Sequence, residues 1–217
     1  MPFITFEGID QSGKSTQLQL LAEAARQSGQ SVITTREPGG TPLGDQIRKM
    51  LLGPEHTGMD PWAEALLYAA ARAQLIQDVI NPALAEGSIV ISDRYIDSSL
   101  AYQGIARGLG VQRVLELNNW ATGGLLPDLT ILLRIEVDVS RDRLLNRGES
   151  SDRIESEPLE FHRRVEEGYH EIEAMFPERI AGIDGSGPPE EIHQWIVAIC
   201  QERLGWELGQ TDADRPA

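Results

Sequence analysis

Cysteine is nearly absent from this 217-residue chain, which contains Cys200 alone. One cysteine forms neither an intramolecular disulfide framework nor a cysteine-based zinc site. Long hydrophobic runs are also missing, since no stretch approaches the ~18 apolar residues typical of a membrane-spanning helix. The segment from Met1 to Phe6 is too short and uncharged for a signal peptide. We therefore expect a cytoplasmic protein that has no membrane partner.

Positive charge is scarce as well, because 19 basic residues stand against 34 acidic ones and the net charge is −15. Nucleic acids and anionic membranes attract Lys and Arg, so this balance argues against either as a partner. Lys14 and Lys49 are the only lysines, and every other basic residue is an arginine. Arginine binds phosphate through a planar set of donors. The arginines between Arg134 and Arg164 therefore indicate either a phosphate site or a solvated helix face.

The chain has the length of one α/β domain, which we predict over residues 1–208, followed by a disordered acidic tail at 209–217. Apolar runs predict strands at 3–6, 31–35, 88–92, 129–135 and 179–184. Helical spacing predicts helices at 14–25, 41–52, 61–85 with a kink at Pro82, 138–147 with Asp138 as its cap, 158–175 and 188–204.

Strands that alternate with helices predict a parallel sheet covered on both faces. We therefore expect a three-layer α/β/α fold with a five-stranded parallel sheet. Sheets of this kind bind ligands beyond the carboxyl ends of their strands. Gly8, Arg36, Glu37 and Asp93 all lie at such ends. The organisation of the chain and its polar residues therefore point to the same edge of the sheet.

Residues 8–15 match the phosphate-binding pattern G-x-x-x-x-G-K-[ST] without a mismatch, between a predicted strand and a predicted helix. The loop must point backbone N–H groups at an anion, and glycines permit that conformation. The lysine then reaches the β- and γ-phosphates, and the last hydroxyl is placed to bind Mg²⁺. The residues assigned to the phosphates of ATP are Gly8, Ile9, Asp10, Gln11, Ser12, Gly13, Lys14, Ser15 and Thr16.

Several classes of nucleotide-binding protein use such a loop, and the other residues favour a small-molecule kinase. Switch GTPases read guanine with an Asn-Lys-x-Asp element, which is not found around Lys14 or Lys49. A kinase needs a second anion site and a basic lid over the transferring group. The segment at about 147–156 is a candidate lid, and Arg143, Arg147 or Arg153 can contact the γ-phosphate. An ordinary surface loop is the alternative.

Asp93 and Arg94 directly follow the strand predicted at 88–92. Asp93 can hold Mg²⁺ through water, opposite Ser15. Arg94 can lie between two phosphates that otherwise repel each other, and Arg48 and Arg72 are further candidates for binding the acceptor. A local ion pair between Asp93 and Arg94 is the alternative.

From Phe3 to about Leu204 the chain resembles the bacterial thymidylate kinases, a family of P-loop nucleoside monophosphate kinases. The resemblance depends on blocks beyond the P-loop that adenylate and guanylate kinases lack. These blocks are Phe6-Glu7-Gly8, Thr35-Arg36-Glu37-Pro38-Gly39-Gly40-Thr41, Leu66-Leu67-Tyr68-Ala69-Ala70-Ala71-Arg72, and residues 93–104, which read DRYIDSSLAYQG. The resemblance implies transfer of the γ-phosphoryl group from ATP to dTMP, which gives dTDP, with Mg²⁺ as cofactor. It also implies a homodimer, for which the long apolar helix from Pro61 is a candidate interface.

The resemblance also implies roles for individual residues. Tyr68 would stack on thymine, Arg72 would donate to a thymine carbonyl, and Gln103 or Ser99 would bind the base edge. Tyr102 would lie beneath the deoxyribose. The residues implied in binding dTMP are Glu37, Pro38, Arg48, Tyr68, Arg72, Arg94, Ser98, Ser99, Tyr102 and Gln103. The implied catalytic residues are Lys14, Arg94, Arg147, Arg153 and Asp10, and the implied Mg²⁺ ligands are Ser15 and, through water, Asp93.

One departure affects the expected mechanism. Gln11 stands where bacterial members commonly have Gly and some eukaryotic members have Arg. Glutamine is neutral, so an arginine of the lid must supply the positive charge near the γ-phosphate. Two other functions remain open at this point. One is a kinase of another pyrimidine monophosphate or of a deoxynucleoside, and the other is a regulatory protein that binds or hydrolyses ATP.

Overall fold

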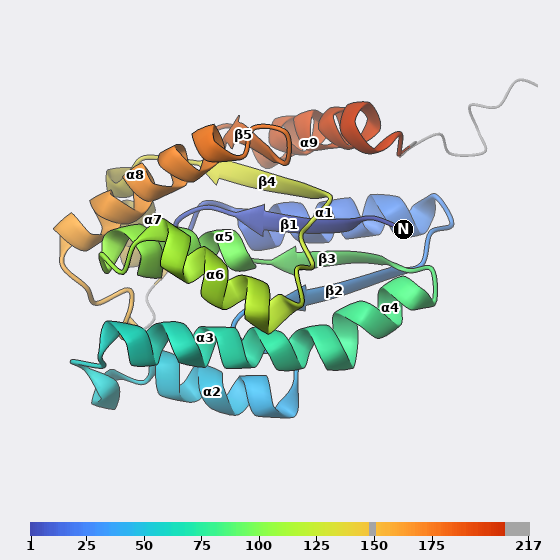
Figure 1. The fold of residues 1–217 in the computed structure, drawn as a ribbon. Helices are drawn as coiled ribbons and strands as arrows, with labels where there is room; N and C mark the ends of the chain where they lie inside the picture. The colour runs from blue at the N-terminus through green and yellow to red at the C-terminus, as the bar shows by residue number, and fades with distance from the viewer. Residues whose placement is uncertain (148–150, 207–217) are drawn as a thin grey trace, which may run out of the picture.

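A computed structural model describes residues 1–147 and 151–206 of the chain (Figure 1). Its centre is a parallel sheet of five strands in the order β2-β3-β1-β4-β5. The strands are β1 (Phe3–Glu7), β2 (Val32–Arg36), β3 (Ile89–Asp93), β4 (Leu129–Arg134) and β5 (Ile180–Asp184). The sheet confirms the predicted number of strands and their parallel arrangement.

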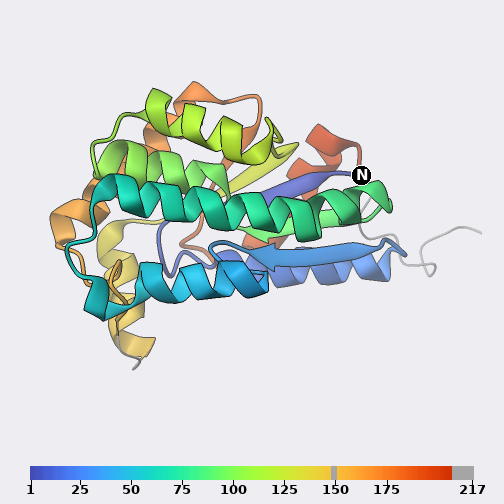
Figure 2. The same cartoon turned by 60° about the horizontal axis from the view of Figure 1, so that its bottom comes forward.

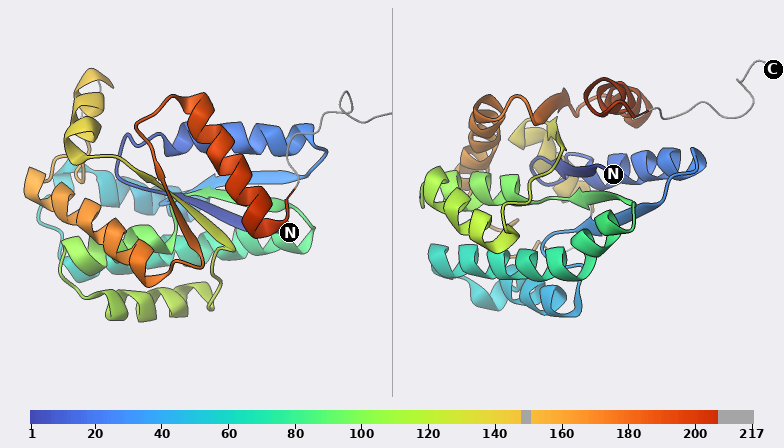
Figure 3. Two further views of the ribbon diagram at one scale, coloured as in Figure 1. Left: turned by 90° about the horizontal axis from the view of Figure 1, so that it is seen from above. Right: turned by 45° about the vertical axis from the view of Figure 1, so that its right-hand side comes forward.

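Helices cover both faces of the sheet. The α-helices are α1 (Lys14–Gln27), α2 (Pro42–Leu52), α3 (Pro61–Leu75), α4 (Asn81–Ala85), α5 (Ile96–Ser99), α6 (Val111–Thr122), α7 (Val137–Arg147), α8 (Leu159–Met175) and α9 (Pro189–Leu204). Short 3₁₀ and π segments are η1 (Pro54–His56), η2 (Ile76–Ile80) and η3 (Leu100–Ala106). Helices α1 and α9 pack together on one face, whereas α8, η3 and α6 lie on the other (Figure 3). Helix α2 packs on the outer side of α3 (Figure 2).

Alternation along the central strands divides the core between the two faces, as expected for a pleated strand. In β1, Ile4 and Phe6 belong to the cluster beneath α1 and α9, whereas Phe3 packs with Val90 and Tyr95 on the opposite face. The sheet register pairs Phe6 with Asp93. The carboxyl ends of β1 and β3 therefore lie side by side, which places the P-loop next to the residues that follow β3.

Most predicted elements are present at nearly the predicted residues, and the differences are local. No element was predicted between β3 and β4, and this stretch contains α5, η3 and α6. Asp138 was predicted to cap a helix, but α7 begins at Val137 and Asp138 lies in its first turn. Residues 148–150 of the predicted lid and the predicted tail at 209–217 lie outside the described residues. Within the described ranges, no helix is both long and apolar enough to cross a bilayer.

A buried ion pair connects the sheet to α5. Arg179, the residue before β5, donates to Asp97 Oδ2 at 2.6 Å and to Asp97 Oδ1 at 2.8 Å. Thr130 of β4 donates to the same carboxylate at 3.1 Å. The carboxylate is thus paired and hydrogen-bonded, which is the condition under which a buried charge is tolerated.

We expect Asp97→Ala to lower the free energy of unfolding by roughly 3 to 5 kcal/mol, because the variant leaves the Arg179 cation without its partner. Arg134→Ala is the matched control, because Arg134 is 43% exposed and pairs with Glu173 at 3.6 Å. The control should lose less than about 1 kcal/mol. Urea denaturation followed by circular dichroism measures both values. Equal losses in the two variants would contradict the assignment.

Candidate functional site

The P-loop connects β1 to α1 through glycines that cannot be replaced without strain. Gly8 has a φ of 137°, and a Cβ atom at this position would lie 2.4 Å from the carbonyl oxygen of Leu133. Gly13 has a φ of 94° and precedes the first residue of α1. Positive φ angles of this kind favour glycine, and they turn successive backbone N–H groups inward. The local conformation is therefore the one that the sequence pattern predicts.

Lys14 is held inside this loop by its own backbone. The Nζ atom donates to the carbonyl oxygen of Ile9 at 2.8 Å and to that of Gly8 at 3.1 Å. Burial and the nearby Arg94 cation lower the pKa of Lys14 to about 8, although nearby carboxylates partly oppose the shift. The ammonium thus lies inside the P-loop, next to the carbonyl oxygens of Gly8 and Ile9.

The Ser15 hydroxyl donates to Asp93 Oδ2 at 2.7 Å, which joins the start of α1 to the end of β3. The two side chains predicted to bind Mg²⁺ are therefore in direct contact. Within the described ranges, no cluster of three or more His, Cys, Asp or Glu side chains could hold a metal by itself. Mg²⁺ is usually bound by one or two carboxylates together with substrate phosphates, so this pair suits such an ion.

Arg94 occupies the centre of the site in a strained conformation. Its backbone angle φ is 73°, which is unfavourable for any residue other than glycine. Its Nη2 atom donates to Asp10 Oδ1 at 2.7 Å, and the same atom lies 3.3 Å from the hydroxyl of Tyr102. Burial raises the pKa of Asp10, but the charges of Arg94 and Lys14 outweigh that effect and lower it overall. Arg94 therefore pairs with the P-loop, and Asp93 with Ser15, instead of with each other as in the local alternative.

Two cavities meet at Arg94. The first has a volume of about 600 Å³ and is lined by Asp10, Gln11, Gly13, Lys14, Ser15, Thr16, Arg36, Glu37, Arg48, Asp93, Arg94, Asp152 and Glu155. We call it the donor cavity. It includes most residues assigned to the ATP phosphates, whereas Gly8 and Ile9 face a different cavity. Ser12 is buried and lies within 3.5 Å of Lys14.

The second cavity, which we call the acceptor cavity, is lined by Asp10, Glu37, Pro38, Arg48, Leu52, Tyr68, Arg94, Ser98, Ser99, Tyr102, Gln103, Asp152 and Ile154. Except for Arg72, this set contains all residues implied in binding dTMP. The two cavities share Asp10, Glu37, Arg48, Arg94 and Asp152. Ligands in the two cavities could thus both contact these five shared residues.

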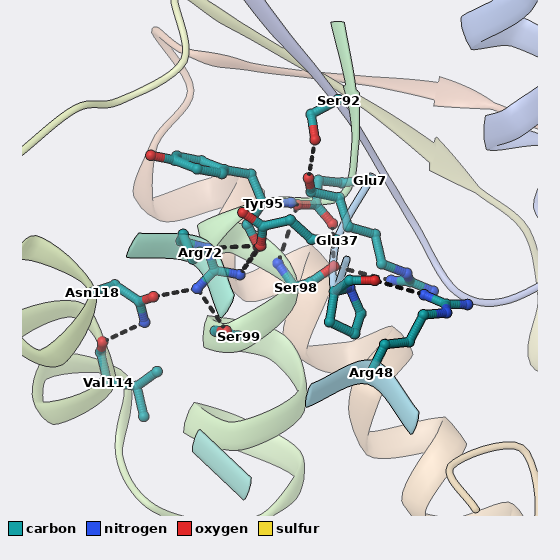
Figure 4. A network of polar contacts seen from close by, with 12 residues as sticks. Glu7, Glu37, Arg48, Arg72, Ser92, Tyr95, Ser98, Ser99, Val114 and Asn118 are labelled. Carbon is teal, nitrogen blue, oxygen red and sulfur yellow. Dashed lines mark hydrogen bonds and ion pairs between the residues drawn. The ribbon is translucent and has the colours of Figure 1, made fainter. Parts of the chain in front are cut away.

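Arg72 is 1% exposed and is not among the residues that line the acceptor cavity. Figure 4 shows its guanidinium between Glu37, Ser99 and Asn118. Its Nε and Nη2 atoms donate to Glu37 Oε2, and Nη2 also donates to the carbonyl oxygen of Tyr95 at 2.9 Å. Its Nη1 atom donates to Ser99 Oγ at 3.1 Å and to Asn118 Oδ1. All five N–H donors of the guanidinium thus have acceptors. For Arg72 to donate to a thymine carbonyl, one of these bonds must be exchanged.

Glu37 offers an unused acceptor at the same place. Its Oε2 atom binds Arg72, whereas Oε1 is buried and has no hydrogen-bond partner in the described structure. Burial raises the pKa of Glu37, and Arg72 opposes that shift. A buried polar atom without a partner is unfavourable unless a ligand supplies one. Because Glu37 lines both cavities, Oε1 suits a hydroxyl or metal-bound water of a ligand.

Arg153 does not reach the donor cavity, which departs from its predicted catalytic role. It is 5% exposed, and its guanidinium donates to Glu64 Oε2 at 2.7 Å and to the carbonyl oxygen of Leu51 at 2.6 Å. The prediction for Arg153 rested on its place in a polar segment. That signal does not reveal its partner Glu64 on α3. The side chain of Arg147 lies outside the described residues. Arg143 of α7, in contrast, donates to the carbonyl oxygen of Gln11 at 3.0 Å.

Several lining or supporting residues had no predicted role. Asp152 and Glu155 line the donor cavity, and Glu7 and Tyr169 contact the residues around Arg94. Glu7 had a recognisable signal, since it is a charged residue within an apolar strand directly before the P-loop. Tyr169 had none, because its position in α8 matches the apolar spacing of a core residue.

Substitution of Arg153 should mainly lower stability, whereas substitution of Arg143 should mainly lower kcat. Arg153→Ala should lower the free energy of unfolding by roughly 3 kcal/mol, because it removes a buried partner of Glu64. Arg143→Ala should change stability by less than about 1 kcal/mol, because one partly exposed hydrogen bond is lost. It should lower kcat by roughly tenfold, because a cation next to the P-loop is removed. Urea denaturation and steady-state kinetics on both variants test this reversal, and a larger stability loss in Arg143→Ala would contradict it.

Comparison with known proteins gives consistent results. The family model described as thymidylate kinase matches residues 6–196. A thymidylate kinase from Pelotomaculum thermopropionicum is 46% identical over 202 residues, which cover 93% of this chain and 94% of the relative. One from Exiguobacterium sp. is 48% identical over 202 residues, which cover 93% and 95% respectively. The crystal structure of thymidylate kinase from Ehrlichia chaffeensis matches with a TM-score of 0.74 and 34% identity, and the match covers 92% of this chain and 98% of that one.

Proposed function

The chain belongs to the thymidylate kinase family, and we propose that its two adjoining cavities hold ATP and dTMP on either side of Arg94. The protein is an ATP-dependent kinase that phosphorylates dTMP to dTDP, a precursor of dTTP. The observation that best supports the assignment of residues is the wall that the two cavities share. Two phosphate groups that must approach each other need cations between them, and Arg48 and Arg94 lie in this shared wall.

The reaction requires positioning and charge neutralisation more than acid–base chemistry. An oxygen of the dTMP phosphate attacks the γ-phosphorus of ATP, and the bond from that phosphorus to the β,γ-bridging oxygen breaks to release ADP. The attacking oxygen is already anionic near neutral pH, so no strong general base is needed. Lys14 lies where it can bind the β- and γ-phosphates, and Arg94 lies between donor and acceptor. Both cations would stabilise charge on the transferring group.

The acceptor cavity suits a pyrimidine nucleotide. Tyr68 lines the cavity, and an aromatic ring can stack on a base. Gln103 and Ser99 offer hydrogen-bonding groups at the same wall, and Tyr102 would lie beneath the deoxyribose. We assign the unpaired Oε1 atom of Glu37 to the sugar hydroxyl or to metal-bound water. Arg48, which donates to the carbonyl oxygen of Pro38 at 2.9 Å, can turn to the acceptor phosphate.

We assign Mg²⁺ to the hydroxyl of Ser15 and, through water, to Asp93. The direct contact of 2.7 Å between these side chains supports the assignment, because one small ion can be reached from both. The ion would neutralise charge on the β- and γ-phosphates. The protein is also expected to act in the cytoplasm, where ATP is supplied.

We expect Lys14→Met and Arg94→Ala each to lower kcat by about 10³-fold or more, because each removes a cation from the transferring group. The fold should persist in both, which circular dichroism checks. A coupled assay for ADP, run with dTMP, dUMP, dCMP, UMP and thymidine, measures turnover and acceptor preference together. Near wild-type turnover in either variant would contradict the proposed roles, and equal turnover of all acceptors would contradict the proposed acceptor cavity.

We also propose that two copies of the chain associate through an exposed apolar stripe of α3. Trp62 and Leu66 lie one turn apart on this helix and are 37% and 54% exposed, and Ala70 extends the same stripe. Burial of large apolar side chains against a second copy would stabilise a dimer. Helix α3 also carries Tyr68 and Arg72, so the same helix would connect the interface to the acceptor cavity.

Leu66→Glu should convert the dimer to a monomer at micromolar concentration, because it buries a charge in the proposed interface. Leu20→Glu is the matched control, since Leu20 is a partly exposed leucine on α1, on the opposite face of the sheet. Light scattering coupled to size exclusion measures both masses. A Leu66→Glu protein with the mass of the wild type would overturn this interface.

A further inference from the structure

Glu7 is a buried carboxylate with no role in the site so far described. It ends β1 and is 0% exposed. Strand alternation places it on the same face as Phe3 and Thr5, beneath α5 and α8. Neither the donor cavity nor the acceptor cavity includes it among its lining residues. A buried charge that touches no substrate needs a structural partner or a function that compensates for its desolvation.

The Glu7 carboxylate accepts four hydrogen bonds in the described structure. Its Oε1 atom accepts from the backbone N–H of Tyr95 at 2.8 Å and from that of Ser98 at 3.2 Å. Its Oε2 atom accepts from Ser98 Oγ at 2.6 Å and from Tyr169 Oη at 2.8 Å. Only a carboxylate accepts on both oxygens without contributing a proton of its own. These four donors therefore favour the ionised form of Glu7.

The two hydroxyls that donate to Glu7 also contact Arg94. Arg94 Nη1 lies 3.0 Å from Ser98 Oγ and 2.9 Å from Tyr169 Oη. A hydroxyl has one proton. The two hydroxyls also lie 2.9 Å from each other. With each hydroxyl donating to Glu7, both present lone pairs to the N–H groups of Arg94. The carboxylate thus determines the direction of both hydrogen bonds that hold Nη1.

We propose that Glu7 is a positioning residue for phosphoryl transfer, which acts through the hydroxyls of Ser98 and Tyr169 to hold the Arg94 guanidinium between the two phosphates. The proposal rests on the role of Arg94 proposed above. It accounts for the left-handed backbone of Arg94, since a strained residue persists only where its surroundings determine it strongly. The contact with Asp10 fixes Nη2 of Arg94, and the hydroxyls oriented by Glu7 fix Nη1.

Burial and the charges around Glu7 act on its ionisation in opposite directions. Burial and the Asp97 carboxylate raise the pKa of Glu7 to about 7, whereas the Arg94 cation and hydrogen bonds from Ser98 and Tyr169 lower it. Lys14 of α1 and Arg179 before β5 also interact electrostatically with Glu7. The groups that Glu7 orients therefore favour its ionised form, whereas burial and Asp97 oppose it.

Glu7→Gln tests the proposal because it keeps the shape of the side chain and removes the charge. An amide NH₂ at the Oε1 position would face two backbone N–H donors. At the Oε2 position it would turn the hydroxyl protons of Ser98 and Tyr169 toward Arg94. Neither orientation satisfies all donors, so we expect kcat to fall roughly 10- to 100-fold with little change in the KM for ATP.

A double-mutant cycle with Arg94→Lys separates positioning from general loss of structure. If Glu7 acts through Arg94, Glu7→Gln should change kcat by less than about threefold in the Arg94→Lys background. Asp97→Asn is the matched control, since Asp97 is another buried carboxylate on the same face but pairs with Arg179. It should lower stability and leave kcat within about threefold of the wild type. Tyr169→Phe removes one acceptor of Arg94 and should lower kcat roughly 3- to 10-fold.

Circular dichroism and urea denaturation identify variants that fold. A folded Glu7→Gln protein with wild-type kcat would overturn the proposal, as would equal effects of Glu7→Gln in the wild-type and Arg94→Lys backgrounds. If Glu7→Gln does not fold, wild-type kcat in Tyr169→Phe overturns it instead. If Arg94→Lys itself retains wild-type kcat, the proposed role of Arg94 fails. If Arg94 is required and Glu7 is not, the positioning role of Glu7 alone fails.

Discussion

The parallel pairing of β1 with β3 is the constraint on which the rest of the site depends. Their register places Phe6 beside Asp93, and the backbone N–H of Arg94 donates to the carbonyl oxygen of Phe6 at 2.9 Å. The chain leaving β1 forms the P-loop, and the chain leaving β3 supplies Asp93 and Arg94. A phosphate-binding loop and a cation that can hold a second phosphate are therefore neighbours because two strands pair in one register, before any side-chain contact is considered.

Buried charges then connect this edge of the sheet to the surrounding helices. Glu37 and Arg72 join the loop after β2 to α3, and Glu64 joins α3 to Arg107 and Arg153. Such pairs contribute little net stability compared with apolar packing, but breaking one is costly, so they limit the arrangements that the helices can adopt. The walls of the acceptor cavity are built on these pairs. Its shape is consequently set by electrostatics as much as by the hydrophobic core.

The elements that could be predicted from sequence were those with a local signal. The P-loop was predicted because glycines, lysine and serine at fixed spacing between a strand and a helix have one good structural explanation. The stretch from Ile96 to Ala106 was not predicted to be helical, because it mixes α and π hydrogen bonding and lacks a clear apolar period. Arg153 was predicted to contact the γ-phosphate but pairs with Glu64, and Glu7 was given no role. Their partners Glu64, Ser98 and Tyr169 are 89 to 162 residues away in the chain, and one sequence does not reveal such pairs.

The environment of Lys14 has a consequence for chemical reactivity. An ordinary lysine is almost wholly protonated at neutral pH and is a poor nucleophile, whereas a pKa of about 8 leaves an appreciable neutral fraction. The chain has one other lysine, Lys49 on α2. Lys14 is buried at the donor cavity, so bulk reagents have little access to it. An electrophile carried on a nucleotide would be delivered beside this amine, and covalent labelling of the ATP site would thus need no cysteine.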